Sequence, residues 1–141
     1  MVRTKICNTL NETLDYAEEF AAQLRPGDVV ALYGNLGAGK TAFTQGVALG
    51  LGIDTPVTSP TYALWQTYDG GDLVLHHFDL YRLDTPEQVY AIGFEDAINS
   101  DGVTLIEWPE RLEDKIPVPR IEVYIDRIDE TSRTITIREI V

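Results

Sequence analysis

The feature that most constrains this chain is the segment from Gly34 to Thr41, which reads Gly-Asn-Leu-Gly-Ala-Gly-Lys-Thr. It fits the phosphate-binding pattern Gly-x-x-x-x-Gly-Lys-Ser/Thr at every fixed position. Glycines let the backbone wrap closely around an anion, with several N–H groups turned toward one centre. In such a loop Lys40 reaches the β- and γ-phosphates of a nucleotide, and the Thr41 hydroxyl binds magnesium.

The residues on either side of this segment supply the structural context that such a loop requires. Residues 28–33 form a short apolar run, which is typical of a buried parallel strand. Residues 42–51 read as a helix. Strand, glycine loop and helix therefore follow in the expected order; the alternative is a glycine-rich turn with an incidental lysine.

Length and composition limit the possible classes of protein. The 141 residues suit one domain with one core, so we expect a single phosphate-loop domain over residues 1–141. The formal net charge is −12 and the basic residues are scattered, which disfavours tight, direct binding of a nucleic acid and makes a basic partner protein more plausible. Cys7 is the single cysteine, which excludes an intrachain disulfide and a cysteine cluster for zinc.

The sequence contains no long uncharged apolar segment that could span a bilayer. Residues 1–7 also lack the apolar core of a signal peptide. We therefore expect a cytoplasmic location and no membrane partner.

The other segments predict an α/β fold. A capping box at Thr9–Glu12 opens a helix that should end at Arg25-Pro26-Gly27. One face of this helix is predicted to carry Leu10, Leu14, Ala17, Ala21 and Leu24. Residues 63–68 and 73–78 read as antiparallel strands joined by the turn Asp69–Asp72.

The second half of the chain continues the same alternation of elements. A helix should begin at Thr85-Pro86 and end at Gly93, and the next strand should run from Val103 to Glu107. A C-terminal β-hairpin should turn across Asp126–Ser132. The expected architecture is a three-layer fold like that of phosphate-loop NTPases, with a mixed sheet, parallel in its centre, and helices on both faces.

Two acidic residues are candidates for the second metal anchor that a phosphate loop needs. Asp79 ends the run Leu73–Asp79, and Glu107 ends the run Val103–Glu107. Each should emerge at the carboxyl edge of the sheet, where ligands bind in open α/β folds. The alternative for either acid is a solvated residue that merely ends a strand.

Several further residues near these acids are weaker candidates. His76 and His77 are adjacent, so on a strand they face opposite sides and cannot both bind one metal. Trp108 could pack over the site or belong to the core. Arg82 and Arg111 could bind phosphate or be solvated. A loop that could sense the γ-phosphate, or form an ordinary proline turn, contains Thr58, Ser59, Pro60, Thr61 and Tyr62.

Four blocks together resemble the bacterial TsaE family: the phosphate loop, Thr-Ser-Pro-Thr-Tyr at 58–62, His-Phe-Asp-Leu-Tyr-Arg at 77–82 and Leu-Ile-Glu-Trp-Pro-Glu-Arg at 105–111. The last two are far more specific than the loop, and the resemblance covers nearly the whole chain. It implies a small ATPase needed to make N6-threonylcarbamoyladenosine at position 37 of tRNAs that read codons beginning with A. It also implies that the protein acts with TsaD and TsaB, is not itself the transferase, and meets tRNA only through them.

The resemblance also implies roles for individual residues. It places Thr41 and Glu107 on Mg²⁺, Lys40 on the phosphates, Asp79 as the acid needed for hydrolysis, and Trp108 in the wall of the site. The segment 58–62 becomes a switch-like loop. Adenine should lie between the region of Leu10 and that of Arg133. The remaining ATP contacts are implied at Asn35, Leu36, Gly37, Ala38, Gly39, Lys40, Thr41 and Ala42.

Other functions remain open on the residues alone. A small kinase would need an acceptor pocket and an arginine-bearing lid, for which the chain has little length. A GTPase would carry an Asn-Lys-x-Asp motif, and none occurs. A scaffold that binds nucleotide without hydrolysis is the non-enzymatic alternative, and the presence of both Asp79 and Glu107 disfavours it.

Overall fold

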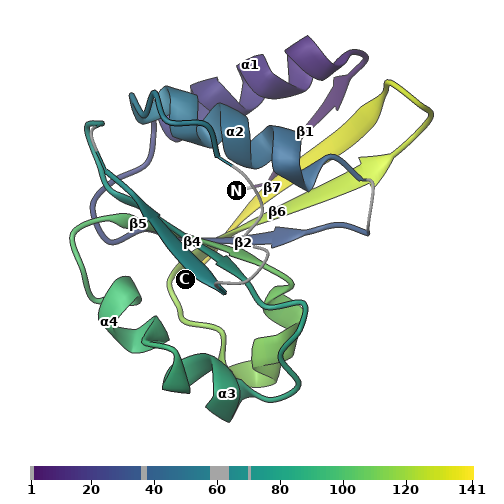
Figure 1. Ribbon diagram of the computed structural model, residues 1–141. Helices are drawn as coiled ribbons and strands as arrows, with labels where there is room; N and C mark the ends of the chain where they lie inside the picture. The colour runs from purple at the N-terminus through teal and green to yellow at the C-terminus, as the bar shows by residue number, and fades with distance from the viewer. Residues whose placement is uncertain (1, 36–37, 58–63, 70) are drawn as a thin grey trace.

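The computed structural model has an α/β fold with helices on both faces of one mixed sheet (Figure 1). It describes residues 2–35, 38–57, 64–69 and 71–141. Within these residues the sheet has seven strands, in the order β1-β7-β6-β2-β5-β4-β3. The strands are β1 (Val2–Cys7), β2 (Val29–Tyr33), β3 (Trp65–Tyr68), β4 (Leu75–Asp79), β5 (Val103–Glu107), β6 (Arg120–Arg127) and β7 (Arg133–Ile140). The helices are α1 (Leu10–Ala21), α2 (Lys40–Gly50), α3 (Pro86–Ala91), α4 (Phe94–Ile98) and the 3₁₀ segment η1 (Pro109–Lys115).

The centre of the sheet is parallel and its margins are antiparallel, as the sequence predicts. Strand β2 pairs in parallel with both β5 and β6, and β5 pairs in parallel with β4. The pairs β3–β4, β6–β7 and β1–β7 are antiparallel. The C-terminal hairpin is therefore confirmed, and β2 is buried between parallel neighbours, which explains its unbroken apolar sequence.

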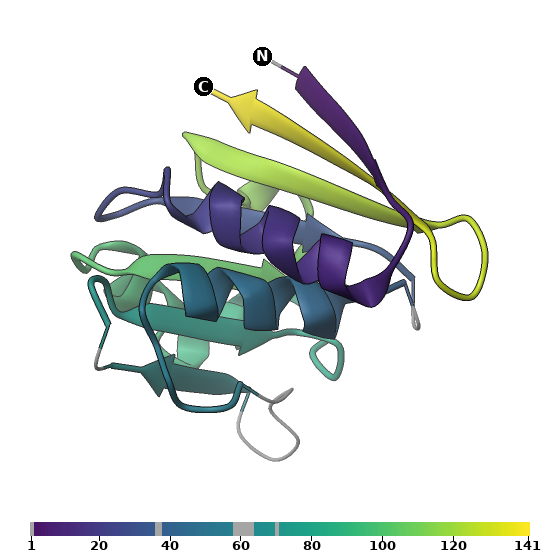
Figure 2. The ribbon, with the colours of Figure 1, turned by 90° about the horizontal axis from the view of Figure 1, so that it is seen from above.

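Two helical layers cover the sheet. Figures 1 and 2 show α1 and α2 side by side on one face, and Figure 1 shows α3, α4 and η1 on the other. The contact between α1 and α2 uses glycine against alanine: a Cβ on Gly46 would lie 2.6 Å from the Cβ of Ala17, and one on Gly50 would lie 2.6 Å from that of Ala21. These helices can approach closely because α2 lacks side chains at both points.

Each layer encloses its own apolar cluster. Between the sheet and α1 and α2 lie side chains such as Phe43, Val47 and Leu105. Between the sheet and α3, α4 and η1 lie others, including Phe78 and Phe94. The parallel strands thus carry alternate side chains into two separate cores.

The first helix differs from its prediction. Thr9 is its N-cap, because the Glu12 N–H donates to Thr9 Oγ1 at 3.1 Å, and the Glu12 carboxylate accepts from the Asn8 N–H at 3.3 Å. The helix nevertheless ends at Ala21, before the proline, and Leu24 lies beyond it. Leu10 is 62% exposed rather than buried. The residues of α1 that are buried are Thr13, Ala17, Phe20 and Ala21.

Two other elements were not predicted. Strand β1 pairs with β7 at the edge of the sheet, a position that its own mixed sequence does not reveal. Gly93 follows α3 as expected, but it also has φ of 98° and serves as the N-cap of α4. The chain therefore turns directly from one short helix into another.

Candidate functional site

The predicted order of strand, loop and helix is confirmed around residues 34–41, of which Leu36 and Gly37 lie outside the described residues. The segment follows β2 and leads into α2. Gly39 has φ of 105°, a left-handed conformation that favours glycine, and it caps α2. The Ala38 N–H donates to the Asn35 carbonyl at 3.0 Å.

Arg133 ties the C-terminal hairpin to this loop. Its Nε donates to the Ala38 carbonyl at 2.7 Å, and its Nη1 donates to the carbonyls of Asp129 and Ser132. A Cβ on Gly39 would lie 3.3 Å from the same Nε. The structure therefore places Arg133 against Ala38 and Gly39 of the phosphate loop.

The two regions predicted to flank adenine lie near each other. Ser132 Oγ donates to Asn8 Oδ1 at 3.5 Å, and Cys7 is paired with Arg133 across β1 and β7. Leu10 begins α1 just beyond this contact and is exposed. The contact of either region with adenine stays a prediction.

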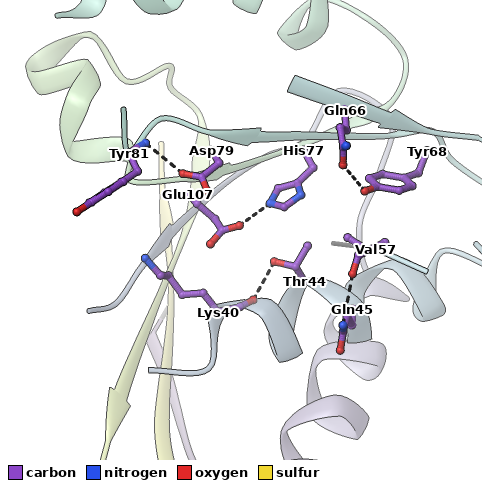
Figure 3. A network of polar contacts seen from close by, with 10 residues as sticks. All are labelled: Lys40, Thr44, Gln45, Val57, Gln66, Tyr68, His77, Asp79, Tyr81 and Glu107. Carbon is purple, nitrogen blue, oxygen red and sulfur yellow. Dashed lines mark hydrogen bonds and ion pairs between the residues drawn. The ribbon is translucent and has the colours of Figure 1, made fainter. Parts of the chain in front are cut away.

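The two candidate acids lie side by side at the carboxyl edge of the sheet. Asp79 is the last residue of β4, Glu107 is the last of β5, and the two are register partners in the parallel pair. In Figure 3 both side chains lie on the side of the sheet occupied by Lys40, the first residue of α2. Lys40 is 7% exposed. The fold thus gathers the three predicted charged groups at one place.

Glu107 has a partner that the sequence interpretation missed. Its Oε2 lies 2.5 Å from His77 Nε2, and both residues are almost fully buried (Figure 3). His77 precedes Asp79 by two residues, and side chains two apart on a strand share a face. That spacing was the signal that could have placed His77 in the site and left His76 outside it.

Asp79 is less buried than Glu107, yet its surroundings disfavour the ionised form of its carboxyl group. Burial raises the pKa of Asp79, and so does the neighbouring Glu107 carboxylate. The Tyr81 N–H, which donates to Asp79 Oδ1 at 3.1 Å, opposes this shift, as do His77 and Lys40. The net result is a pKa of Asp79 above the usual value for an aspartate, chiefly because of burial.

Trp108 lies beside Lys40, and its place in the wall of a nucleotide site stays a prediction. The Lys40 Nζ is 4.2 Å from the centroid of the Trp108 ring, and the Tyr81 ring centroid is 4.9 Å from it. The Arg111 guanidinium is 5.6 Å from the same ring. Trp108 itself has φ of 58°, an uncommon conformation for a non-glycine residue, which directs the chain from β5 into η1.

The remaining predicted residues are only partly described. Thr41 lies in the first turn of α2 with its side chain exposed, whereas Ala42 is 8% exposed and faces inward. Thr58, Ser59, Pro60, Thr61 and Tyr62 lie outside the described residues.

The oxygen atoms gathered here suit magnesium. A hydroxyl at Thr41 and carboxylates at Glu107 and Asp79 are hard ligands of the kind this ion prefers. Among the described residues, no group of three or more His, Cys, Asp or Glu side chains could enclose a metal by itself. Such a site fits an ion that keeps several waters and binds phosphate oxygens.

A cavity of about 760 Å³ lies away from these residues, at the opposite edge of the sheet. It is lined by Arg3 at the start of β1, Arg120 at the start of β6 and Ile140 at the end of β7, among others. It offers no acceptor pocket next to the phosphate loop. Within the part of the chain that the structure describes, no helix is long and apolar enough to cross a membrane.

This chain is similar to known proteins over most of its length. The family model "Threonylcarbamoyl adenosine biosynthesis protein TsaE" matches residues 7–135. The TsaE protein of Rickettsia bellii is 42% identical over 129 residues, covering 91% of this chain and 89% of its own. That of Bacillus subtilis is 41% identical over 125 residues, covering 89% and 78%. The crystal structure of Bacillus subtilis YdiB superposes with a TM-score of 0.83 at 33% identity, covering 100% of this chain and 87% of that one. The chain therefore belongs to the TsaE family and has a role in the biosynthesis of threonylcarbamoyladenosine in tRNA.

Proposed function

We propose that this protein is an ATPase that binds ATP and Mg²⁺ at residues 34–41 and acts with TsaD and TsaB in threonylcarbamoyladenosine formation. The modified base is the adenosine at position 37 of tRNAs that read codons beginning with A. The tRNA is held by the partners, since the net charge of −12 repels a phosphate backbone. The chain assists the transfer and does not perform it.

One observation carries the proposal: buried Lys40 faces two acids that occupy paired positions at the ends of β4 and β5. A lysine and two carboxylates at the carboxyl edge of a parallel sheet match the needs of phosphoryl transfer, in which positioning and charge neutralisation supply most of the catalysis. The raised pKa of Asp79 adds support, because a desolvated acid is characteristic of functional sites.

Each residue then has a role. Lys40 contacts the β- and γ-phosphates, while Thr41 and Glu107 bind the metal ion, directly or through its water. Magnesium, when bound, neutralises charge on the phosphates. Asp79 orients the attacking water or the water shell of the ion. Trp108 covers one side of Lys40 and limits access of bulk water.

Hydrolysis by the isolated chain is slow. Arg133 already donates to three backbone carbonyls and Arg111 donates to the Tyr81 carbonyl at 3.1 Å, so both have partners other than a phosphate. An arginine supplied in trans increases such rates by roughly 10³–10⁵. The TsaD–TsaB complex therefore supplies or organises the missing element.

The test is reconstitution of threonylcarbamoyl transfer to tRNA with TsaD and TsaB over multiple turnovers, with and without this chain. Transfer should require both the chain and ATP. A chain that carries Lys40→Ala should fail to support transfer. Lys115→Ala is the matched control, because Lys115 is exposed and its side chain pairs with the exposed Glu87 at 3.2 Å, away from the phosphate loop.

Two results would contradict the proposal. Transfer that is equally fast without the chain would favour a kinase or a scaffold instead. Hydrolysis by the chain alone that is fast, and unchanged when TsaD and TsaB are added, would show that no element is missing.

A further inference from the structure

His77 lies in the interior of the sheet and is held firmly. Its strand, β4, runs between β3 and β5, and its register partners are Gln66 and Leu105. The side chain is 1% exposed, and Nε2 is 2.5 Å from Glu107 Oε2. An ionised carboxylate only accepts hydrogen bonds, so Nε2 carries the hydrogen.

The other ring nitrogen has no such partner. His77 Nδ1 is buried and lacks a hydrogen-bond partner among the residues that the structure describes. A buried polar atom left unpaired destabilises the folded state. Histidine is therefore less favourable at this buried position than an apolar residue would be. What the imidazole contributes is its contact with Glu107.

We propose that His77 is a positioning residue for Glu107, a role that rests on the proposed function. It binds Oε2 and thereby directs Oε1 into the site. Figure 3 shows the second carboxylate oxygen pointing away from His77, toward the side where Lys40 lies. No residue in the described part of the chain forms a hydrogen bond with Oε1.

Fixing one oxygen matters because magnesium requires near-ideal octahedral geometry. A glutamate side chain that is free to rotate would present either oxygen, or both, at varying positions. Asp79 is held in a similar manner, since the Tyr81 N–H binds its Oδ1 at 3.1 Å. Each acid of the site thus has one oxygen held by the protein.

The test compares His77→Gln with His77→Asn. A glutamine amide reaches about as far from the backbone as imidazole Nε2, whereas an asparagine amide reaches only to the position of Nδ1. We would measure the Mg²⁺ concentration needed for half-maximal binding of a fluorescent, non-hydrolysable ATP analogue. We expect His77→Asn to raise this concentration about 10-fold or more, as losses of groups that orient metal ligands do, and His77→Gln to restore most of the loss.

Three controls separate this role from general damage. His76→Gln, on the opposite face of β4, should leave the Mg²⁺ requirement unchanged. Thermal melts of all variants report folding. In a Glu107→Gln background, His77→Asn should add no further effect.

The outcomes distinguish two failures. If the unmodified protein binds the analogue without any Mg²⁺ dependence, the proposed function fails. If that dependence exists but His77→Asn and His77→Gln change it equally, or neither changes it, the positioning role is wrong.

Discussion

The two faces of strand β4 place neighbouring residues in opposite physical situations. Toward α2, His77 and Asp79 meet Glu107 at the site, where one ring nitrogen is unpaired within the described residues and one acid is desolvated. On the face toward α3 and α4, His76 has hydrogen-bond partners and Phe78 packs against aromatic rings. Phe78 stacks on Trp65 with ring centroids 5.1 Å apart and meets Phe94 edge-on at 5.2 Å.

His76 has partners on both ring nitrogens. Trp65 Nε1 donates to its Nδ1 at 3.3 Å, so Nε2 carries the hydrogen and faces Ser100 Oγ at 3.0 Å. Ser100 Oγ in turn donates to the Ala97 carbonyl at 2.6 Å. On the face toward α3 and α4 the polar groups of His76 are paired, whereas the face toward α2 carries an unpaired ring nitrogen, within the described residues, and an acid with a raised pKa.

The largest expected effect is on the face toward α3 and α4. Phe78→Ala should lower the free energy of unfolding by about 3–5 kcal/mol, because it leaves a cavity between two aromatic rings. Chemical denaturation measures this. Nucleotide affinity of the fraction that remains folded should be unchanged; a large loss of affinity at full folding would show that the two faces are not independent.

The opposite pattern is expected for Lys40→Ala. Hydrolysis should fall by about 10²- to 10³-fold, as it does when a group that stabilises transition-state charge is removed. The melting temperature should fall only modestly, by the loss of the contact with the Trp108 ring, since Lys40 makes no ion pair with another described residue. Steady-state phosphate release and a thermal melt measure the two effects, and a strongly lowered melting temperature would assign Lys40 to the core instead.

Asp79→Asn should slow ATP hydrolysis and at the same time raise the stability of the fold. The folded-state pKa of Asp79 is raised, so its ionisation opposes folding once the pH exceeds the unfolded value. Asparagine keeps an acceptor for the Tyr81 N–H but never ionises. At pH 7 the variant should melt at a higher temperature than the unmodified protein and hydrolyse ATP much more slowly.

The increase in melting temperature from Asp79→Asn should depend on pH. Near pH 3 the aspartate is protonated in both folded and unfolded states, so the advantage of asparagine should vanish. A variant that melts lower at pH 7 would show that Asp79 stabilises the fold.

The smallest effect concerns His76. Burial lowers the pKa of His76, so the unfolded chain binds its proton more readily than the folded one. Stability from this residue is complete above the unfolded pKa of about 6.5 and is lost as the pH falls below it. We expect a loss of at most about 1 kcal/mol, the value of one hydrogen bond.

His76→Gln does not titrate and should flatten this dependence. Urea unfolding of both proteins between pH 5 and pH 8 measures the difference. Identical curves would show that folding does not change the proton affinity of His76.

Much of the site could be predicted because its chemistry is local. The loop spacing requires Lys40 next to Thr41, and an acid at the end of an apolar strand must reach the carboxyl edge. Three features could not be predicted in this way. The exposure of Leu10, the edge strand β1 and the partner of Glu107 depend on which elements pack together, and these elements are far apart in the sequence.

The sequence by itself determined the phosphate loop, the parallel centre of the sheet and the two acids, because periodicity and turn chemistry act over a few residues. Only the tertiary structure decided that Asp79 and Glu107 are register partners, and that His77, which shares the face of Asp79, contacts Glu107. Register between strands separated by more than twenty residues is set by the packing of whole faces. No local pattern encodes that packing, so the pairing of charges across the sheet emerges only when the chain has folded.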